Sequence, residues 1–145
     1  MSGREIAEIL GGRKVLGRTV ASSFDFADII EKGLSRSALE HVKEILKLTD
    51  REVSSTLDIS EKTVSRLRHD PNRRLPVATS DRLYRVARLF ALAEGVLEDK
   101  EQARDWLRSP QIGLNNRLPL ELMRTEAGAR EVEDLLIRIE YGVLS

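Results

Sequence analysis

The sequence contains no cysteine among its 145 residues, which excludes disulfide bonds and thiolate metal sites. It has no apolar run near the roughly 18 residues that a membrane-spanning helix needs. The opening segment, MSGREIAEIL, carries acidic side chains where a secretory signal would carry an apolar core. We therefore expect a cytoplasmic protein without a membrane partner.

Residues suited to catalysis are also few. His41 and His69 are the only histidines, and neither has a neighbour at the spacing of a metal site or an activated nucleophile. Acidic pairs such as Glu131 and Asp134 stand three residues apart, as on ordinary exposed helix faces. Motifs of phosphate-binding loops, dinucleotide folds and nucleophile elbows do not occur. The sequence thus predicts a protein that is not an enzyme and needs no metal or cofactor.

The residue pattern favours helices over strands. Aromatic residues make up only 4% of the chain, and β-branched residues rarely alternate with polar ones. Apolar residues recur at intervals of three and four, so we expect an all-α helical bundle of one ordinary domain or two small ones. Capping residues, glycines and prolines predict helices at residues 4–10, 24–30, 37–47, 80–97, 99–107 and 126–141, two within 49–69, and a short one that starts at Pro119.

The strongest motif is the pair of short helices in residues 49–69, joined by a tight turn. Thr49 and Glu52 have the spacing of a capping box at the start of the first helix, and Ser60 is a good N-cap for the second. Asp58 occupies the sharp reversal between them, where aspartate tolerates the left-handed conformation. This pattern predicts a helix-turn-helix. Its apolar inner face consists of Val53, Leu57, Ile59, Val64 and Leu67.

The second helix of this motif turns hydroxyl and cationic side chains outward. If its N-terminal part enters the major groove of DNA, Lys62 and Arg66 reach guanine edges, the serines bond base edges or phosphate, and the threonine meets a thymine methyl group. Three further arginines bind phosphate. Each charge alone is also typical of a solvated surface, so the prediction depends on their grouping. The predicted DNA-binding residues are Ser60, Lys62, Thr63, Ser65, Arg66, Arg68, Arg73 and Arg74.

Charge is unevenly distributed, although the formal net charge of the chain is +0. Residues 35–93 hold 12 Lys and Arg against 8 Asp and Glu, an excess of 4 positive charges, whereas residues 94–145 hold 7 against 11, an excess of 4 negative charges. We interpret the basic middle and the acidic C-terminal part as facing different partners. The last residues, YGVLS, form an apolar tail that either folds back or is covered by a partner.

Several segments of residues 75–145 occur in the order and at the spacings of one family. They are SDRL at 80–83, RVAR at 85–88, ARDWLRSP at 103–110, PLEL at 119–122, RTEAG at 124–128, VEDLL at 132–136 and IEYGV at 139–143. In these segments the chain resembles the C-terminal region of the Xre/ParS/MbcA-type antitoxins, and residues 33–68 match the upstream pattern of the same family. The likeness covers about three quarters of the chain. The chain departs from the family at Asn115 and Asn116, where Gly-Gly is common, at Leu118, and at Asp58, where Gly is frequent.

The resemblance implies a type II antitoxin that neutralises a RES-domain toxin by direct binding over its active site and represses its own operon through the helix-turn-helix. RES-domain toxins of this group resemble ADP-ribosyltransferases and consume NAD, so NAD belongs to the partner and not to this chain. The resemblance places the toxin-binding residues in the last helix and tail, namely Val132, Leu136, Ile139, Glu140, Tyr141, Gly142, Val143, Leu144 and Ser145.

We therefore expect an N-terminal helical arm at residues 1–34, a helix-turn-helix DNA-binding domain with a long spine helix at 35–98, and a toxin-binding domain at 99–145. The expected partners are the toxin, in a hetero-oligomeric complex, the operator DNA of its own operon, and a second copy of the chain, because repressors usually read palindromes as dimers. An alternative is a stand-alone transcription regulator whose C-terminal region serves dimerisation or ligand binding. A third interpretation is an interaction module whose helix-turn-helix binds DNA weakly and without sequence preference.

Overall fold

The computed structural model describes residues 3–70 and 72–142. These two segments form ten α-helices and one 3-10 helix, with two isolated β-bridges and no β-strand, so the all-α prediction is confirmed. No helix within them combines the length and hydropathy needed to cross a membrane. In chain order the helices are α1 (Gly3–Ile9), α2 (Gly12–Leu16), α3 (Ser23–Lys32), α4 (Arg36–Leu46), α5 (Asp50–Leu57), α6 (Glu61–Leu67), α7 (Val77–Leu97), α8 (Lys100–Leu107), η1 (Ile112–Leu114), α9 (Pro119–Leu122) and α10 (Glu126–Glu140).

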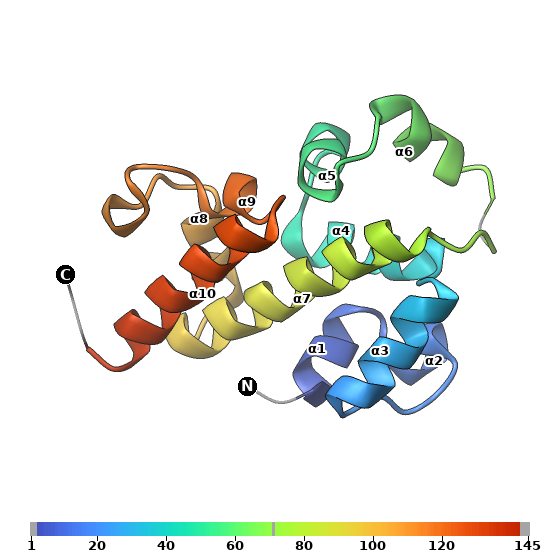
Figure 1. Ribbon diagram of the computed structural model, residues 1–145, viewed down its shortest axis with the longest axis horizontal. Helices are drawn as coiled ribbons and strands as arrows, with labels where there is room; N and C mark the ends of the chain where they lie inside the picture. Colours follow the sequence, from blue (N-terminus) through green and yellow to red (C-terminus); the bar gives the residue numbers. More distant parts are fainter. Residues whose placement is uncertain (1–2, 71, 143–145) are drawn as a thin grey trace.

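The 21-residue helix α7 is the axis of the fold (Figure 1). Helices α1 and α3 pack on one side of it, α5 and α6 lie on the opposite side, and α8 and α10 pack against its C-terminal half. Residues 89–93 of α7 are all buried, which is the pattern of a helix that is surrounded by neighbours. Helices α1, α3, α4, α5, α8 and α10 all pack on α7, and the buried apolar side chains form one continuous core that includes Ile6 near one end of the chain and Leu136 near the other.

Local capping sets four helix boundaries where the sequence predicts them. The side chains of Thr49, Ser60, Asp99 and Thr125 each accept a hydrogen bond from the backbone N–H three residues further on, at 3.0–3.1 Å. These bonds satisfy N–H groups that have no partner inside the first turn of a helix. The predicted starts of α5, α6, α8 and α10 are therefore confirmed.

The start of α4 and two short helices differ from the sequence prediction. Helix α4 begins at Arg36, because Ser35 rather than Ser37 accepts a hydrogen bond from the backbone N–H of Ala38. Helix α2 follows directly after Gly11, where the pattern predicts a stop, and η1 lies in a segment expected to be a loop. Both elements are one turn or little more, too short for an apolar period to be recognised.

Helix α7 begins at Val77, three residues before its predicted start at Ser80. Ser80 is fully buried inside the helix, so it does not act as a cap. Its hydroxyl accepts a hydrogen bond from the backbone N–H of Leu34 at 2.8 Å and donates one to the carbonyl of Leu75 at 3.3 Å. Ser80 therefore fixes α7 to the connection between α3 and α4.

Candidate nucleic-acid interface and C-terminal surface

Helices α5 and α6 form the predicted helix-turn-helix, and local hydrogen bonds hold the turn between them. Asp58 is left-handed (φ 55°, ψ 50°), as predicted, and its backbone N–H donates to the carbonyl of Ser54. The N–H of Ile59 donates to the same carbonyl at 3.1 Å, which closes the last turn of α5. Thr49 and Glu52 form both halves of the predicted capping box. The buried inner face consists of Val53, Leu57, Val64 and Leu67.

The exposed residues of α6 are Glu61, Lys62, Ser65 and Arg66, and we call the part formed by Lys62, Ser65 and Arg66 the outward face of α6. Two other predicted DNA contacts are placed differently. The hydroxyl of Ser60 accepts a hydrogen bond from the Thr63 N–H at 3.0 Å and lies 2.9 Å from the Thr63 hydroxyl. These two hydroxyls therefore stabilise the start of the helix, whereas the outward face projects into solvent.

The three arginines that follow α6 have different surroundings. Arg68 forms an ion pair with Asp50, which offsets part of its charge. Arg74 donates a hydrogen bond to the carbonyl of Gly33 at 3.0 Å. Arg73 is exposed. All three are exposed and stay predicted phosphate contacts.

Arg36 is not among the predicted functional residues, but it holds the end of α6. Its Nη1 donates to the carbonyls of Arg68 at 2.7 Å and Leu67 at 3.4 Å. A cation at this end satisfies carbonyls that have no partner inside the helix and interacts favourably with the helix dipole. No local pattern reveals this role, because the contact joins residues about 30 positions apart in the chain.

Helix α10 packs its apolar stripe against α7, and this corrects part of the predicted toxin contact. Val132 and Leu136 have 0% of their surface exposed. Their side chains fill the core, so they cannot contact a partner while α10 remains on α7. Ile139 is half-buried, and Glu140 and Gly142 are exposed. The other predicted contacts at this end, Val143, Leu144 and Ser145, lie outside the described residues.

Three large apolar side chains are exposed in the described C-terminal region: Ile112 (88%), Ile137 (38%) and Tyr141 (76%). Ile137 and Tyr141 stand four residues apart on α10 and its end, so they share one face of the helix. Tyr141 is one of the predicted toxin contacts, whereas Ile137 is not among them. The sequence does carry a signal that Ile137 is exposed, because Ile137 is one residue past Leu136 and therefore lies about 100° around the helix from the buried stripe.

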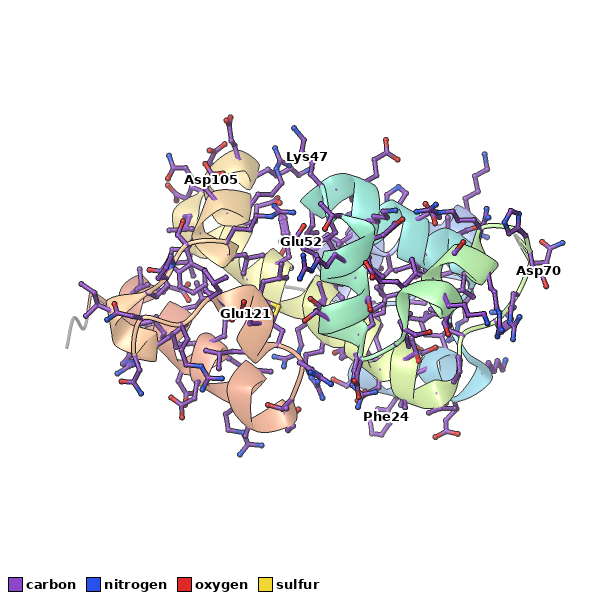
Figure 2. All side chains as sticks on the ribbon, turned by 90° about the horizontal axis from the view of Figure 1, so that it is seen from above. Phe24, Lys47, Glu52, Asp70, Asp105 and Glu121 are labelled. Atoms are coloured by element: carbon purple, nitrogen blue, oxygen red, sulfur yellow. The ribbon has the colours of Figure 1, made fainter. Side chains whose placement is uncertain are left out.

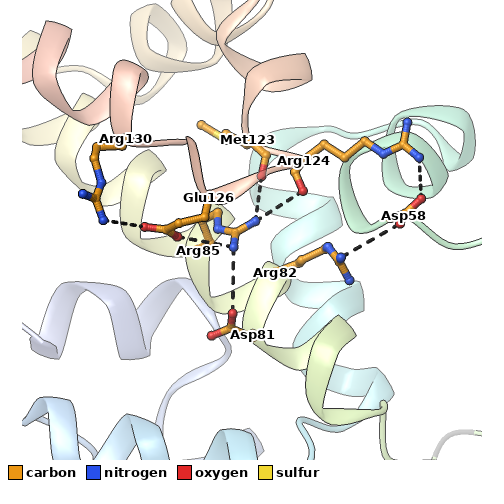
Figure 3. A network of polar contacts seen from close by, with 8 residues as sticks. All are labelled: Asp58, Asp81, Arg82, Arg85, Met123, Arg124, Glu126 and Arg130. Carbon is orange, nitrogen blue, oxygen red and sulfur yellow. Dashed lines mark hydrogen bonds and ion pairs between the residues drawn. The ribbon is translucent and has the colours of Figure 1, made fainter. Parts of the chain in front are cut away.

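Two ion-pair contacts join the C-terminal region to the helix-turn-helix. Arg108, at the end of α8, donates from Nε and Nη2 to the two carboxylate oxygens of Glu52 at 2.9 and 3.0 Å. Glu52 lies where α5 meets the C-terminal region (Figure 2). Burial raises the pKa of Glu52, but the hydrogen bonds from Arg108 and from the Thr49 backbone outweigh it and hold the pKa below its ordinary value. The second contact joins Asp58 in the turn to Arg124 between α9 and α10, at 2.5 Å (Figure 3).

These features define a class of protein: a helix-turn-helix protein with an exposed second helix and a C-terminal helical region packed beside it. Comparisons with known protein families agree with this class and identify the family more specifically. A family model for the antitoxin Xre-like helix-turn-helix domain matches residues 25–88. A second model, for the antitoxin Xre/MbcA/ParS C-terminal toxin-binding domain, matches residues 92–142. Both matches reach into α7, so this helix contributes to both domains.

Individual relatives agree with the family models. Antitoxin Xre of Pseudomonas putida is 31% identical over 128 residues, which cover 85% of this chain and 76% of the relative. Antitoxin Xre of Yersinia enterocolitica is 32% identical over 119 residues, which cover 81% and 80%. The chain therefore belongs to the Xre family of antitoxins, and the resemblance read from its sequence is confirmed. The division at residues 1–34, 35–98 and 99–145 stays a prediction.

Proposed function

We propose that this antitoxin neutralises an NAD-consuming RES-domain toxin by binding directly over the toxin's active site, and that it represses its own operon. One observation carries the proposal: a single core supports both the exposed outward face of α6 and a toxin-binding domain with uncovered apolar side chains. The toxin would supply the chemistry on NAD, and this chain would supply no catalytic group or cofactor. Both partners would meet in the cytoplasm, in a type II toxin–antitoxin complex.

The outward face of α6 supports the DNA-binding half of the proposal. In a helix-turn-helix the second helix enters the major groove, where Lys62 and Arg66 can donate hydrogen bonds to guanine O6 and N7. Arg73 would bind phosphate, which adds affinity without sequence choice. We propose that the chain acts as a homodimer on a palindromic operator, because two-fold symmetry lets two copies of α6 read two half-sites.

The face of α10 that carries Ile137 and Tyr141 supports the toxin-binding half. Exposed apolar surface is unfavourable in water, and covering it with a partner stabilises a complex. We propose that Ile139, Glu140 and residues 142–145, which follow in the sequence, extend this contact across the toxin's pocket. The acidic excess of residues 94–145 favours a toxin surface with a basic rim.

Co-expression with the protein encoded beside its gene tests the toxin-binding half directly. We expect the two proteins to co-purify, and cells that hold both to keep their growth rate and NAD level. Ile137→Asp should weaken neutralisation, because it places a charge on the proposed contact face. Ala127→Asp is the matched control, since it adds the same charge at the exposed N-terminal end of α10. Failure to co-purify would favour the stand-alone regulator.

Charge reversal on α6 tests the DNA-binding half. The double variant Lys62→Glu and Arg66→Glu should lose binding to a duplex that spans the promoter of its own gene, while toxin neutralisation persists. The control reverses two exposed cations of α2, Arg13 and Lys14, on the opposite side of α7 from α6 (Figure 1). It should retain most of the promoter binding. If neutralisation fell together with DNA binding, the proposed assignment of DNA binding to α6 and of toxin binding to the C-terminal region would be wrong.

A further inference from the structure

A polar network joins the toxin-binding domain to the turn of the helix-turn-helix (Figure 3). Its central contact is between Nη2 of Arg124 and Oδ1 of Asp58, which are 2.5 Å apart. Nη2 of Arg82 on α7 lies 3.9 Å from the other carboxylate oxygen of Asp58. Arg124 stands between α9 and α10 in the matched toxin-binding domain, and Asp58 is the left-handed residue at which the chain turns toward α6. The contact therefore spans the two domains.

Arg124 points at Asp58 from an anchored backbone. The side chain of Arg85 on α7 is only 11% exposed, and its Nη1 donates to the carbonyls of Met123 at 3.1 Å and Arg124 at 3.4 Å. Its Nη2 also lies 3.4 Å from the carboxylate of Glu126. The segment between α9 and α10 is thus fixed on α7, and the Arg124 side chain reaches Asp58 from that fixed point.

The other end of α5 is held by the same domain. Arg108 binds both carboxylate oxygens of Glu52, and its Nη2 donates to the carbonyl of Lys47 at 2.6 Å. Helix α5 therefore has an arginine of the toxin-binding domain at each end. Only two residues separate Asp58 from the start of α6, so a displacement of Asp58 moves α6 as well.

We propose that Arg124 is a positioning residue for DNA reading, which sets the orientation of α6 through Asp58. This inference rests on the proposed DNA-binding function. Asp58 and Arg124 are each about half exposed, so their ion pair adds little to the overall stability. Contacts with base edges depend on helix orientation, and loss of the pair should weaken operator binding about two- to fivefold. A toxin that engages the segment around Arg124 would change DNA affinity by the same route.

A double-mutant cycle tests the proposal. The wild type, Asp58→Asn, Arg124→Gln and the double variant are titrated, at one salt concentration, with a duplex that spans the promoter of the chain's own gene. Asp58→Asn preserves side-chain size and asparagine tolerates the left-handed conformation, while Arg124→Gln leaves a shorter polar side chain without the charge. Each single variant should bind about two- to fivefold more weakly, and the double variant no more weakly than either single one, because the contact is already lost. The melting temperatures should stay close to that of the wild type.

The sign of the Asp58→Asn effect separates positioning from simple electrostatics. Removal of an acidic group beside a DNA-reading helix should tighten binding if charge alone mattered, whereas positioning requires weaker binding. Arg130→Gln is the matched control, because it removes the same charge from the same network but breaks only a 3.4 Å contact with Glu126. Its DNA affinity should equal that of the wild type.

Three results would overturn the inference: unchanged or tighter binding by Asp58→Asn, equal effects of Arg130→Gln and Arg124→Gln, or additive effects in the double variant. The proposed function fails in a different way. If the wild type itself bound the promoter duplex no better than a scrambled duplex, DNA reading would be absent and there would be nothing for Arg124 to position.

Discussion

Replacement of Leu136 by alanine tests whether the inner stripe of α10 is core or contact surface. Leu136 has 0% of its surface exposed, in the core that α10 shares with α7. Truncation of a fully buried leucine to alanine costs about 2 to 5 kcal/mol, from the lost transfer free energy and the cavity left behind. Native proteins typically have a free energy of unfolding of roughly 5 to 15 kcal/mol. The substitution should therefore remove a large part of the stability.

The assay is urea unfolding of the wild type, Leu136→Ala and Ile137→Ala, followed by circular dichroism. A loss of about 3 kcal/mol also lowers the melting temperature by roughly 6 to 12 °C. Ile137 is the matched control, because it is the next residue of the same helix and is 38% exposed. Its truncation should cost about 1 kcal/mol or less and should mainly impair toxin neutralisation.

One result would refute the packing argument. If Leu136→Ala unfolded at the same urea concentration as the wild type but no longer neutralised the toxin, Leu136 would be a contact residue and not part of the core. The dependence of the unfolding free energy on urea should be equal in the three proteins, because they expose nearly the same surface on unfolding.

Two further substitutions test the ion pair at α5 and the turn before α4. Glu52→Gln should destabilise the chain at neutral pH but not in acid, because the folded-state pKa of Glu52 is depressed. The Glu52 carboxylate contributes its full stabilisation above the unfolded-state pKa. This stabilisation is lost as the pH falls through the lower folded-state pKa. Urea unfolding across the acid range measures this, and a pH-independent difference would contradict it. Gly33→Ala should cost more than about 1 kcal/mol, since Gly33 has a φ of 88° and an added Cβ would lie 2.4 Å from the carbonyl oxygen of Leu75. Gly12→Ala is its control in thermal unfolding, with a φ of 72° and no atom within 4 Å of the added Cβ; equal costs would show that the neighbouring chain yields to the new methyl group.

The helix-turn-helix could be predicted from the sequence because its signals are local. The capping box of Thr49 and Glu52, the left-handed Asp58 and the cap Ser60 all act within four residues of their partners. Local signals are not sufficient for Ser80. Its residue type suits a helix cap, but its hydroxyl binds the backbone of Leu34, 46 positions away. Only the packing of α7 on the preceding helices decides between the two roles.

The candidate toxin surface could be predicted only in part for a related reason. The four-residue spacing of Val132 and Leu136 suits the buried stripe of a helix, whereas the family resemblance assigns both residues to the toxin contact. The two expectations conflict at these residues, and the core resolves the conflict. The pair of Asp58 and Arg124 carries no signal in the sequence, because two charged residues 66 positions apart look like ordinary solvated surface.

The two matched domains share helix α7, and this sharing determines how proteolysis would inactivate the antitoxin. Residues 89–93 are buried by elements from both sides of the helix, so a protease that removed either half would expose apolar surface on the other. We expect neither fragment to stay folded. Degradation would then end the proposed repression and neutralisation in one event, and free toxin would appear just as transcription of the operon resumed.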